Sequence, residues 1–274
     1  MLGKLIKYEF KASWKYILAI DIITVVIGLF AFFISYNVSD IIDNLNSALA
    51  IILMLCLVGY MFSLIAATLL TTIYNVVHYY KSLYSSEGYL TFTLPATTGQ
   101  ILSAKMLVSI FWQIATSICV GLSIFFLMAG FALYGAQHGT FDFLTSIDDV
   151  YSEFIKALGV SGVFSVIRYL INIFVSIACN LLVFFFAITL GQLWSKHKVL
   201  GSILCFFGTR FALGIVSFVS SMLSGTFSTL FMSDYDPAKY FARSTTVSLL
   251  VSIFVSAILY TGCIVITDRK LNLD

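Results

Sequence analysis

The chain alternates long runs of apolar residues with short polar connections, and this pattern repeats over its whole length. The runs are continuously apolar instead of alternating at period two, and each is long enough for a helix to cross about 30 Å of hydrocarbon. We predict six transmembrane helices, at about 17–36, 47–77, 103–135, 165–194, 199–222 and 244–267. The second and third exceed the roughly 20 residues that a bilayer requires, so they either tilt or continue beyond the membrane as helices.

The composition agrees with this pattern. Hydrophobic residues make up 60% of the chain and charged residues only 10%, whereas charged residues approach a quarter of an ordinary soluble domain. The mean hydropathy is +1.02. We therefore expect an all-α polytopic membrane protein, a single transmembrane domain over residues 1–274 with the lipid bilayer as its surroundings. A net charge of only +2 gives no reason to expect a nucleic-acid partner.

Residues 1–16, "MLGKLIKYEFKASWKY", precede the first run. Leu2, Ile6 and Phe10 recur near helical spacing, while the four lysines fall mostly on other faces. Such a segment favours an amphipathic helix that lies in the membrane interface and is retained, because it lacks the pattern of a cleaved signal peptide.

The orientation follows from the bias in lysine and arginine. One set of connections carries Lys4, Lys7, Lys11, Lys15, Lys81, Lys105, Lys196, Lys198, Arg269 and Lys270, and the opposite set is mainly acidic apart from Lys156, Lys239 and Arg243. Both termini and the connection at 78–102 are therefore predicted to be cytoplasmic. Residues 224–243, on the external side, either dip partway into the membrane or cap the helices.

Several kinds of catalytic chemistry are not expected. The only Gly-Lys pair is Gly3-Lys4, so there is no P-loop, and no histidine pairs with glutamate at the ligand spacing of a membrane zinc protease. The five cysteines are scattered through apolar runs and predict packing, not a metal site or a disulfide framework. No catalytic or metal-ligating residues are expected in this chain.

Two charges fall inside predicted spans. Arg210 lies 12 residues beyond Lys198, about 18 Å along a helix, and Asp21 lies about a turn inside the first span. Because an arginine at that depth is costly, it needs a partner or a water-filled cavity. Asp21 and Arg210 are candidates for an ion pair, Arg210 for a transport pathway; alternatively, Asp21 stays hydrated and Arg210 snorkels. Asn172 and Asn180 are predicted as interhelical hydrogen-bond donors.

The connection "SSEGYLTFTLPATTGQILSAKML", residues 85–107, holds more specific sequence than a turn requires. Ser85 or Ser86 can cap a short helix that Pro95 ends. Thr97 and Gln100 then form a capping box that starts the next helix. "YLTFTL" also alternates as a strand would, but a lone strand has no pairing partner, so a short helix is favoured.

This connection resembles the first cytoplasmic loop of type-2 ABC exporter permeases. The pattern is carried by Glu87, Gly88, Leu90, Leu94, Pro95, Thr97, Ile101, Leu102, Ala104 and Lys105. The opening "GKLIKYEFK" also looks like small permeases of Gram-positive bacteria, and the six spans match the family's arrangement. The resemblance implies a coupling helix that docks into a separate ATPase, with Glu87, Gly88, Tyr89, Leu90, Phe92, Leu94 and Pro95 as the contacting residues.

The resemblance further implies a multi-pass protein of the bacterial plasma membrane that works as a pair of permeases, a homodimer in preference to a heterodimer, with a cytosolic ABC ATPase. ATP and Mg²⁺ would be bound by that partner, and no cofactor by this chain. Phe-rich spans favour an amphipathic or lipid-like cargo, and exporters of phenol-soluble-modulin-like or antimicrobial peptides are the nearest group. The alternatives are a resistance or immunity permease and a non-transporting membrane scaffold or sensor.

Overall fold

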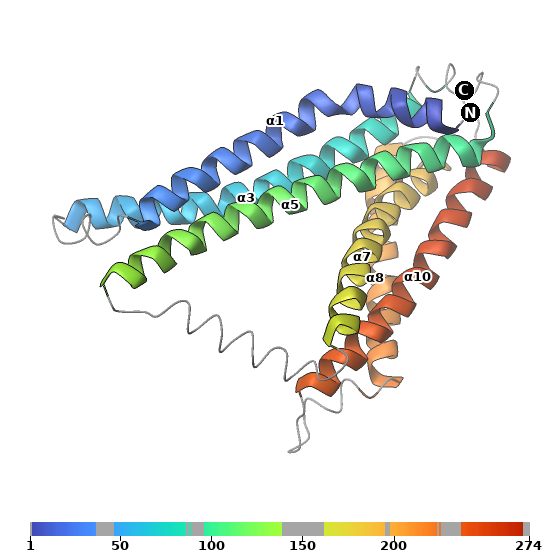
Figure 1. Cartoon of the computed structure of the whole chain (residues 1–274). Helices are drawn as coiled ribbons and strands as arrows, with labels where there is room; N and C mark the ends of the chain where they lie inside the picture. The colour runs from blue at the N-terminus through green and yellow to red at the C-terminus, as the bar shows by residue number, and fades with distance from the viewer. Residues whose placement is uncertain are drawn as a thin grey trace. The chain divides into compact units, whose positions relative to one another are not determined.

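The computed structural model describes residues 2–36, 47–85, 88, 96–138, 162–194, 198–223, 225 and 237–270. This part of the chain folds into long α-helices joined in sequence order (Figure 1). They are α1 (Leu2–Tyr36), α3 (Ser47–Tyr84), α5 (Thr98–His138), α7 (Gly162–Gly191), α8 (Lys198–Leu223) and α10 (Pro237–Lys270).

The prediction of an all-α chain with six spans is confirmed at the level of length and composition. Each of the six helices in the described ranges is long and apolar enough to cross a membrane. Residues 2–16 of the segment predicted to lie in the interface form one continuous helix, α1, with the first predicted span. The cytoplasmic location of the termini stays a prediction, and so does the external location of residues 224–243, which either dip into the membrane or cap the helices.

The sequence left open whether the second and third spans tilt or continue beyond the membrane as helices. These two spans form the longest of the described helices. Helix α3 has 38 residues and α5 has 41. At 1.5 Å per residue, α5 is about 60 Å long, roughly twice the thickness of the hydrocarbon core. Each continues as a helix up to the connection that holds the predicted coupling segment.

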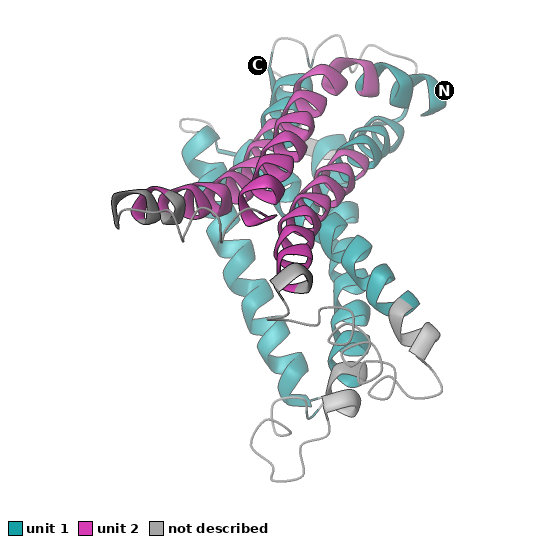
Figure 2. Ribbon diagram, turned by 60° about the vertical axis from the view of Figure 1, so that its left-hand side comes forward, with its two compact units in different colours: residues 1–9, 75–110, 154–274 teal, residues 10–74, 111–153 magenta. Residues whose placement is uncertain are grey.

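The chain divides into two compact units (Figure 2). Unit 1 comprises Met1–Glu9, Asn75–Ile110 and Phe154–Asp274; unit 2 comprises Phe10–Tyr74 and Phe111–Glu153. Helices α1, α3 and α5 each run from one unit into the other, and each unit has a hydrophobic cluster of its own.

Unit 2 is held together by small and hydroxyl-bearing residues between α1, α3 and α5. A Cβ added at Gly28 would lie 2.7 Å from the Cα of Ser123, so α1 and α5 approach too closely there for any other residue. Ser123 also hydrogen-bonds to the hydroxyl of Tyr60 at 3.1 Å, and Ser35 donates to the carbonyl of Leu127 at 3.2 Å. Small residues and interhelical hydrogen bonds are the usual means by which helices associate in lipid. The cluster beside them consists of Ala31, Tyr60, Leu64 and Leu127.

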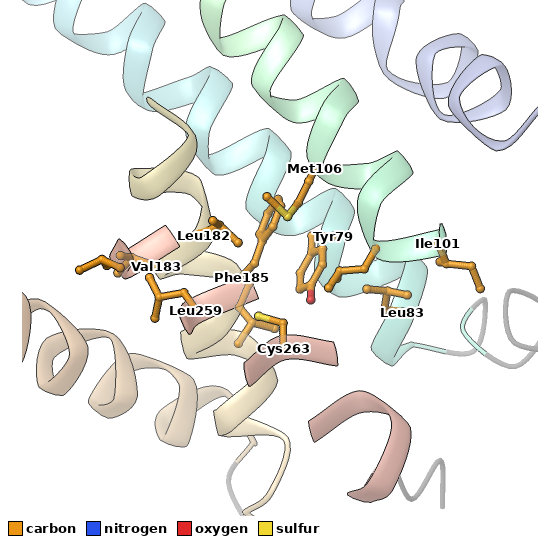
Figure 3. Close-up of a cluster of buried hydrophobic side chains, with 12 residues drawn as sticks. Tyr79, Leu83, Ile101, Met106, Leu182, Val183, Phe185, Leu259 and Cys263 are labelled. Atoms are coloured by element: carbon orange, nitrogen blue, oxygen red, sulfur yellow. The ribbon is translucent and has the colours of Figure 1, made fainter. Parts of the chain in front are cut away.

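Unit 1 is built around α7, which packs against both α8 and α10. Between residues 181 and 189 almost every side of α7 is buried, as expected for a helix enclosed by others. Its Phe185 stacks on Tyr79 of α3 with ring centroids 4.0 Å apart (Figure 3). The buried cluster comprises Tyr79, Leu83, Ile101, Leu102, Met106, Leu182, Val183, Phe185, Ile188, Val255, Leu259 and Cys263.

Helix α8 differs from α7 in how little of it is covered. Gly201 is the buried residue of this helix, where α8 meets the end of α7. Large apolar side chains such as Phe207, Phe211 and Leu223 are exposed along the rest of it. Lipid or another protein chain therefore covers most of α8 in the membrane.

Candidate functional site

The predicted coupling segment lies between α3 and α5. Its residues Glu87, Tyr89, Leu90, Phe92, Leu94 and Pro95 fall outside the described residues, so their part in coupling stays a prediction. Gly88 is described and buried, and its N–H donates to the carbonyl of Ser85 at 2.8 Å. A Cβ at Gly88 would overlap the carbonyl of Leu83. The entry into the segment is therefore so tight that it requires glycine.

Helix α5 begins as the sequence predicts. The N–H of Gln100 donates to the hydroxyl of Thr97 at 3.3 Å and to its carbonyl at 2.9 Å, which confirms Thr97 as the N-cap. The first turns of α5 are also bonded to the last turns of α10. The hydroxyl of Thr98 donates to Asp268, and that of Ser103 lies 2.7 Å from the hydroxyl of Tyr260.

A charged cluster joins α1, the end of α3 and the beginning of α5. One carboxylate oxygen of Glu9 lies 2.7 Å from Nε2 of His78, and the other accepts a hydrogen bond from Nζ of Lys105. The side chain of Lys105 is only 3% exposed. A buried ammonium needs a hydrogen-bonded counter-charge, and Glu9 supplies it across a separation of 96 residues.

A single hydroxyl joins the end of α3 to α7. Thr189 donates to the carbonyl of Phe185 at 2.8 Å, and its oxygen lies 3.1 Å from the hydroxyl of Tyr79 and 3.0 Å from that of Tyr84. The threonine oxygen has two lone pairs in addition to its proton, so it has room for hydrogen bonds with both tyrosine hydroxyls. Thr189 is fully buried.

Farther along α7, α8 and α10, unit 1 contains a polar cavity of about 500 Å³, here called the serine cleft. Seven of the described residues that line it are serines, and they recur at helical spacing on α8 and on α10. They are Ser176 on α7, Ser217, Ser220 and Ser221 on α8, and Ser244, Ser248 and Ser252 on α10.

Arg210 lies in the wall of the serine cleft. Its Nη2 donates to Oδ1 of Asn180 at 2.8 Å, and its guanidinium carbon lies 5.9 Å from the ring centroid of Phe184 and 5.5 Å from that of Phe206. These distances are within the range of cation–π interactions. The structure therefore brings the predicted intramembrane arginine together with the predicted asparagine, and into a cavity.

Asp21, the other predicted intramembrane charge, belongs to unit 2 and Arg210 to unit 1. Asp21 is buried, and its carboxylate is hydrogen-bonded to the hydroxyl of Thr116. The hydroxyl of Thr116 lies 3.2 Å from the hydroxyl of Thr71. Its Oδ1 has no partner among the described residues. The pairing of Asp21 with Arg210 thus stays a hypothesis.

Both predicted asparagines of α7 contact neighbouring helices. Asn180 accepts from Arg210 on α8, and Asn172 accepts from Ser248 on α10 at 3.5 Å. The prediction of interhelical hydrogen bonds is confirmed, but in these bonds each asparagine is an acceptor and not a donor.

Sequence reasoning missed three parts of this arrangement. Lys105 contributes to the charge bias and to the family pattern, but neither signal indicates its buried ion pair. Nothing in the sequence singles out Glu9 or Thr189, because the partners of these residues lie 69 to 110 residues away. The serine cleft did leave a local signal: Ser244, Ser248 and Ser252 follow one another at intervals of four, which places them on one helical face.

No protein-family model, curated protein or solved structure matches the chain significantly. Its function must therefore be inferred from its residues and their geometry.

Proposed function

We propose that the chain is the permease subunit of an ATP-driven exporter, which moves an amphipathic or lipid-like cargo outward with the energy of a separate ABC ATPase. The proposal is supported by the way in which the helix ends that flank residues 85–97 are bonded to other helices. The helix ends on both sides of this connection belong to the same compact unit as α7, α8 and α10.

Specific hydrogen bonds and an ion pair, as well as apolar contacts, hold these helix ends in place. Glu9 connects Lys105 to α1, Thr189 connects Tyr79 and Tyr84 to α7, and Asp268 connects Thr98 to α10. A force applied to the connection would thus reach α1, α7 and α10 through bonded contacts. Coupling requires such a contiguous network with more than one arrangement.

The resemblance to type-2 exporter permeases supplies the source of that force. In this proposal the short segment around Phe92 and Leu94 docks into a cytosolic ABC ATPase, which binds ATP and Mg²⁺. Two copies of the chain form the transporter in a bacterial plasma membrane, and the exposed apolar surface of α8 is available for that association. Peptide toxins and antimicrobial peptides are the cargo that the resemblance favours.

Co-purification tests the proposal. The tagged full chain is expressed with its neighbouring genes, purified in mild detergent, and assayed for a bound ABC ATPase and for ATP hydrolysis. Replacing both Phe92 and Leu94 with Asp should remove the ATPase, because the apolar contact is lost. Thr97→Asp is the matched control, since aspartate also caps a helix and adds charge to the same connection.

The proposal is contradicted if no ABC ATPase accompanies the wild-type chain, or if the Phe92/Leu94 double variant retains as much as the Thr97→Asp control. A resistance permease would give the same co-purification and differ only in cargo. A non-transporting scaffold or sensor would bring down no ATPase.

A further inference from the structure

The serine cleft contains a positive charge whose partners are uncharged. Arg210 lies near the middle of a 26-residue helix, and an arginine at the bilayer centre costs at least about 2.5–3.5 kcal/mol to insert. Among the described residues of unit 1, its contacts are the side-chain oxygen of Asn180 and the faces of Phe184 and Phe206. A carbonyl dipole and two aromatic rings orient a guanidinium without neutralising it.

The surroundings of this charge divide into a polar and an apolar side. On the polar side, the serines of α8 and α10 supply hydroxyl groups that rotate to donate hydrogen bonds. On the other side, a second cavity of about 330 Å³, here called the apolar cleft, lies between α3, α7 and α8. Val76, Tyr80, Ile203 and the Phe184–Phe206 pair are among its lining residues.

Arg210 lines the serine cleft and contacts two residues of the apolar cleft. Phe184 and Phe206 stack with their centroids 4.7 Å apart, and both line the apolar cleft. The guanidinium lies over these same rings while it lines the serine cleft. One ligand could therefore place an anionic group on Arg210 and an apolar chain against the phenylalanines.

The size of the clefts favours a lipid-like ligand over a peptide. Their volumes of about 500 and 330 Å³ lie within the range that single small ligands fill, about 300–1,000 Å³. An α-helical peptide is about 10–12 Å wide and rises about 5.4 Å per turn, so roughly one turn would fill the larger cleft.

We infer that the two clefts form one binding site for a single-chain anionic amphiphile, with its carboxylate or phosphate on Arg210 and its hydrocarbon chain along Phe184 and Phe206. The identification of this ligand as a cargo rests on the proposed function. Its binding does not, because the site lies within one chain and requires neither ATP nor an ATPase.

Equilibrium binding to the full chain in phosphatidylcholine nanodiscs tests the inference, with radiolabelled oleate as the anionic probe and oleyl alcohol as its uncharged counterpart. Wild-type protein should bind oleate at least about tenfold more tightly than the alcohol. Arg210→Gln should raise the Kd for oleate by about the same factor and leave that for the alcohol unchanged, whereas Arg210→Lys should stay within roughly threefold of wild type. Phe206→Ala should weaken both probes. Lys198→Gln is the control for general attraction of oleate to a cationic protein, because it removes a charge from α8 outside both clefts.

Equal binding of oleate and oleyl alcohol by the wild-type chain would overturn the inference, and this comparison requires no variant to fold. Equal losses in Arg210→Gln and Lys198→Gln would also overturn it. So would saturable binding of a synthetic amphipathic peptide without saturable binding of oleate. If oleate does not bind but the ATPase still co-purifies, the binding site is rejected and the proposed exporter function is not. If oleate binds but no ATPase co-purifies, the exporter function is rejected and the binding site is retained.

Discussion

Nε2 of His78 lies 2.7 Å from one carboxylate oxygen of Glu9, 69 residues earlier in the chain, and the second oxygen of Glu9 accepts from Lys105. One carboxylate thus fixes the first helix to the end of α3 and the beginning of α5. The predicted coupling segment connects these two helix ends.

Glu9→Gln should destabilise the protein because it leaves the buried ammonium of Lys105 without a counter-charge. Removing one member of a buried pair costs about 3–5 kcal/mol, and we expect the lower end since Glu9 keeps partial exposure. Unfolding of the purified protein in mixed micelles measures the change. Lys4→Gln, an exposed substitution in the same helix, is the control, and Glu9→Gln/Lys105→Met should recover part of the loss. Equal stability of Glu9→Gln and Lys4→Gln would show that the cluster is not stabilising.

Thr189→Val should lower stability because it removes an oxygen that lies within hydrogen-bonding distance of the Tyr79 and Tyr84 hydroxyls in the buried cluster. A buried donor left without an acceptor costs about 1–3 kcal/mol. Thr189→Ser keeps the oxygen and should retain most of the stability, apart from the loss of one methyl group. The same unfolding measurement compares the two variants, and similar losses for Val and Ser would assign the role of Thr189 to packing alone.

Gly88→Ala should disturb the entry into the coupling segment, because the new methyl group would overlap the Leu83 carbonyl. Gly99→Ala is the matched control, since its Cβ would meet only the Ile264 side chain at an ordinary 3.7 Å. We expect Gly88→Ala to reduce the amount of co-purified ATPase severalfold, and Gly99→Ala to leave it unchanged. If both variants retain the ATPase fully, the geometry at Gly88 has no part in docking.

Exchanging the charges of Asp21 and Arg210 separates the two hypotheses for the arginine. If Arg210 serves an anionic ligand, the Asp21→Arg/Arg210→Asp variant should bind oleate no better than Arg210→Asp alone. Recovery of binding and stability by the exchange, beyond either single substitution, would establish an ion pair between the two residues. It would also reject the ligand as the counter-charge of Arg210.

The features that the sequence predicted correctly are those that depend on neighbouring positions. Apolar runs predicted the six helices because crossing hydrocarbon requires a continuous helix. The Thr97 cap was recognisable because its partner, Gln100, is three residues away. The distance of Arg210 from Lys198 placed it well inside a helix, and it lies near the middle of the 26-residue α8.

The features that the sequence did not predict depend on which helices pack against one another. Nothing near Glu9 indicates Lys105, and nothing near Thr189 indicates Tyr79, because their proximity is created by tertiary packing. The apolar cleft likewise combines ordinary valine, isoleucine and phenylalanine positions from α3, α7 and α8, which individually look like any membrane-facing residues. Only the serine spacing on α10 offered a local clue that was overlooked.

Transport into inside-out membrane vesicles that contain the chain and its ATPase is the direct test of ATP-driven export. Uptake of labelled cargo, with oleate and an amphipathic peptide assayed separately, should require ATP and should be abolished by the Phe92/Leu94 double variant. Arg210→Gln should reduce the uptake of oleate while ATPase binding is retained. The account is contradicted if neither cargo accumulates in vesicles with the ATPase bound, or if accumulation is the same without ATP.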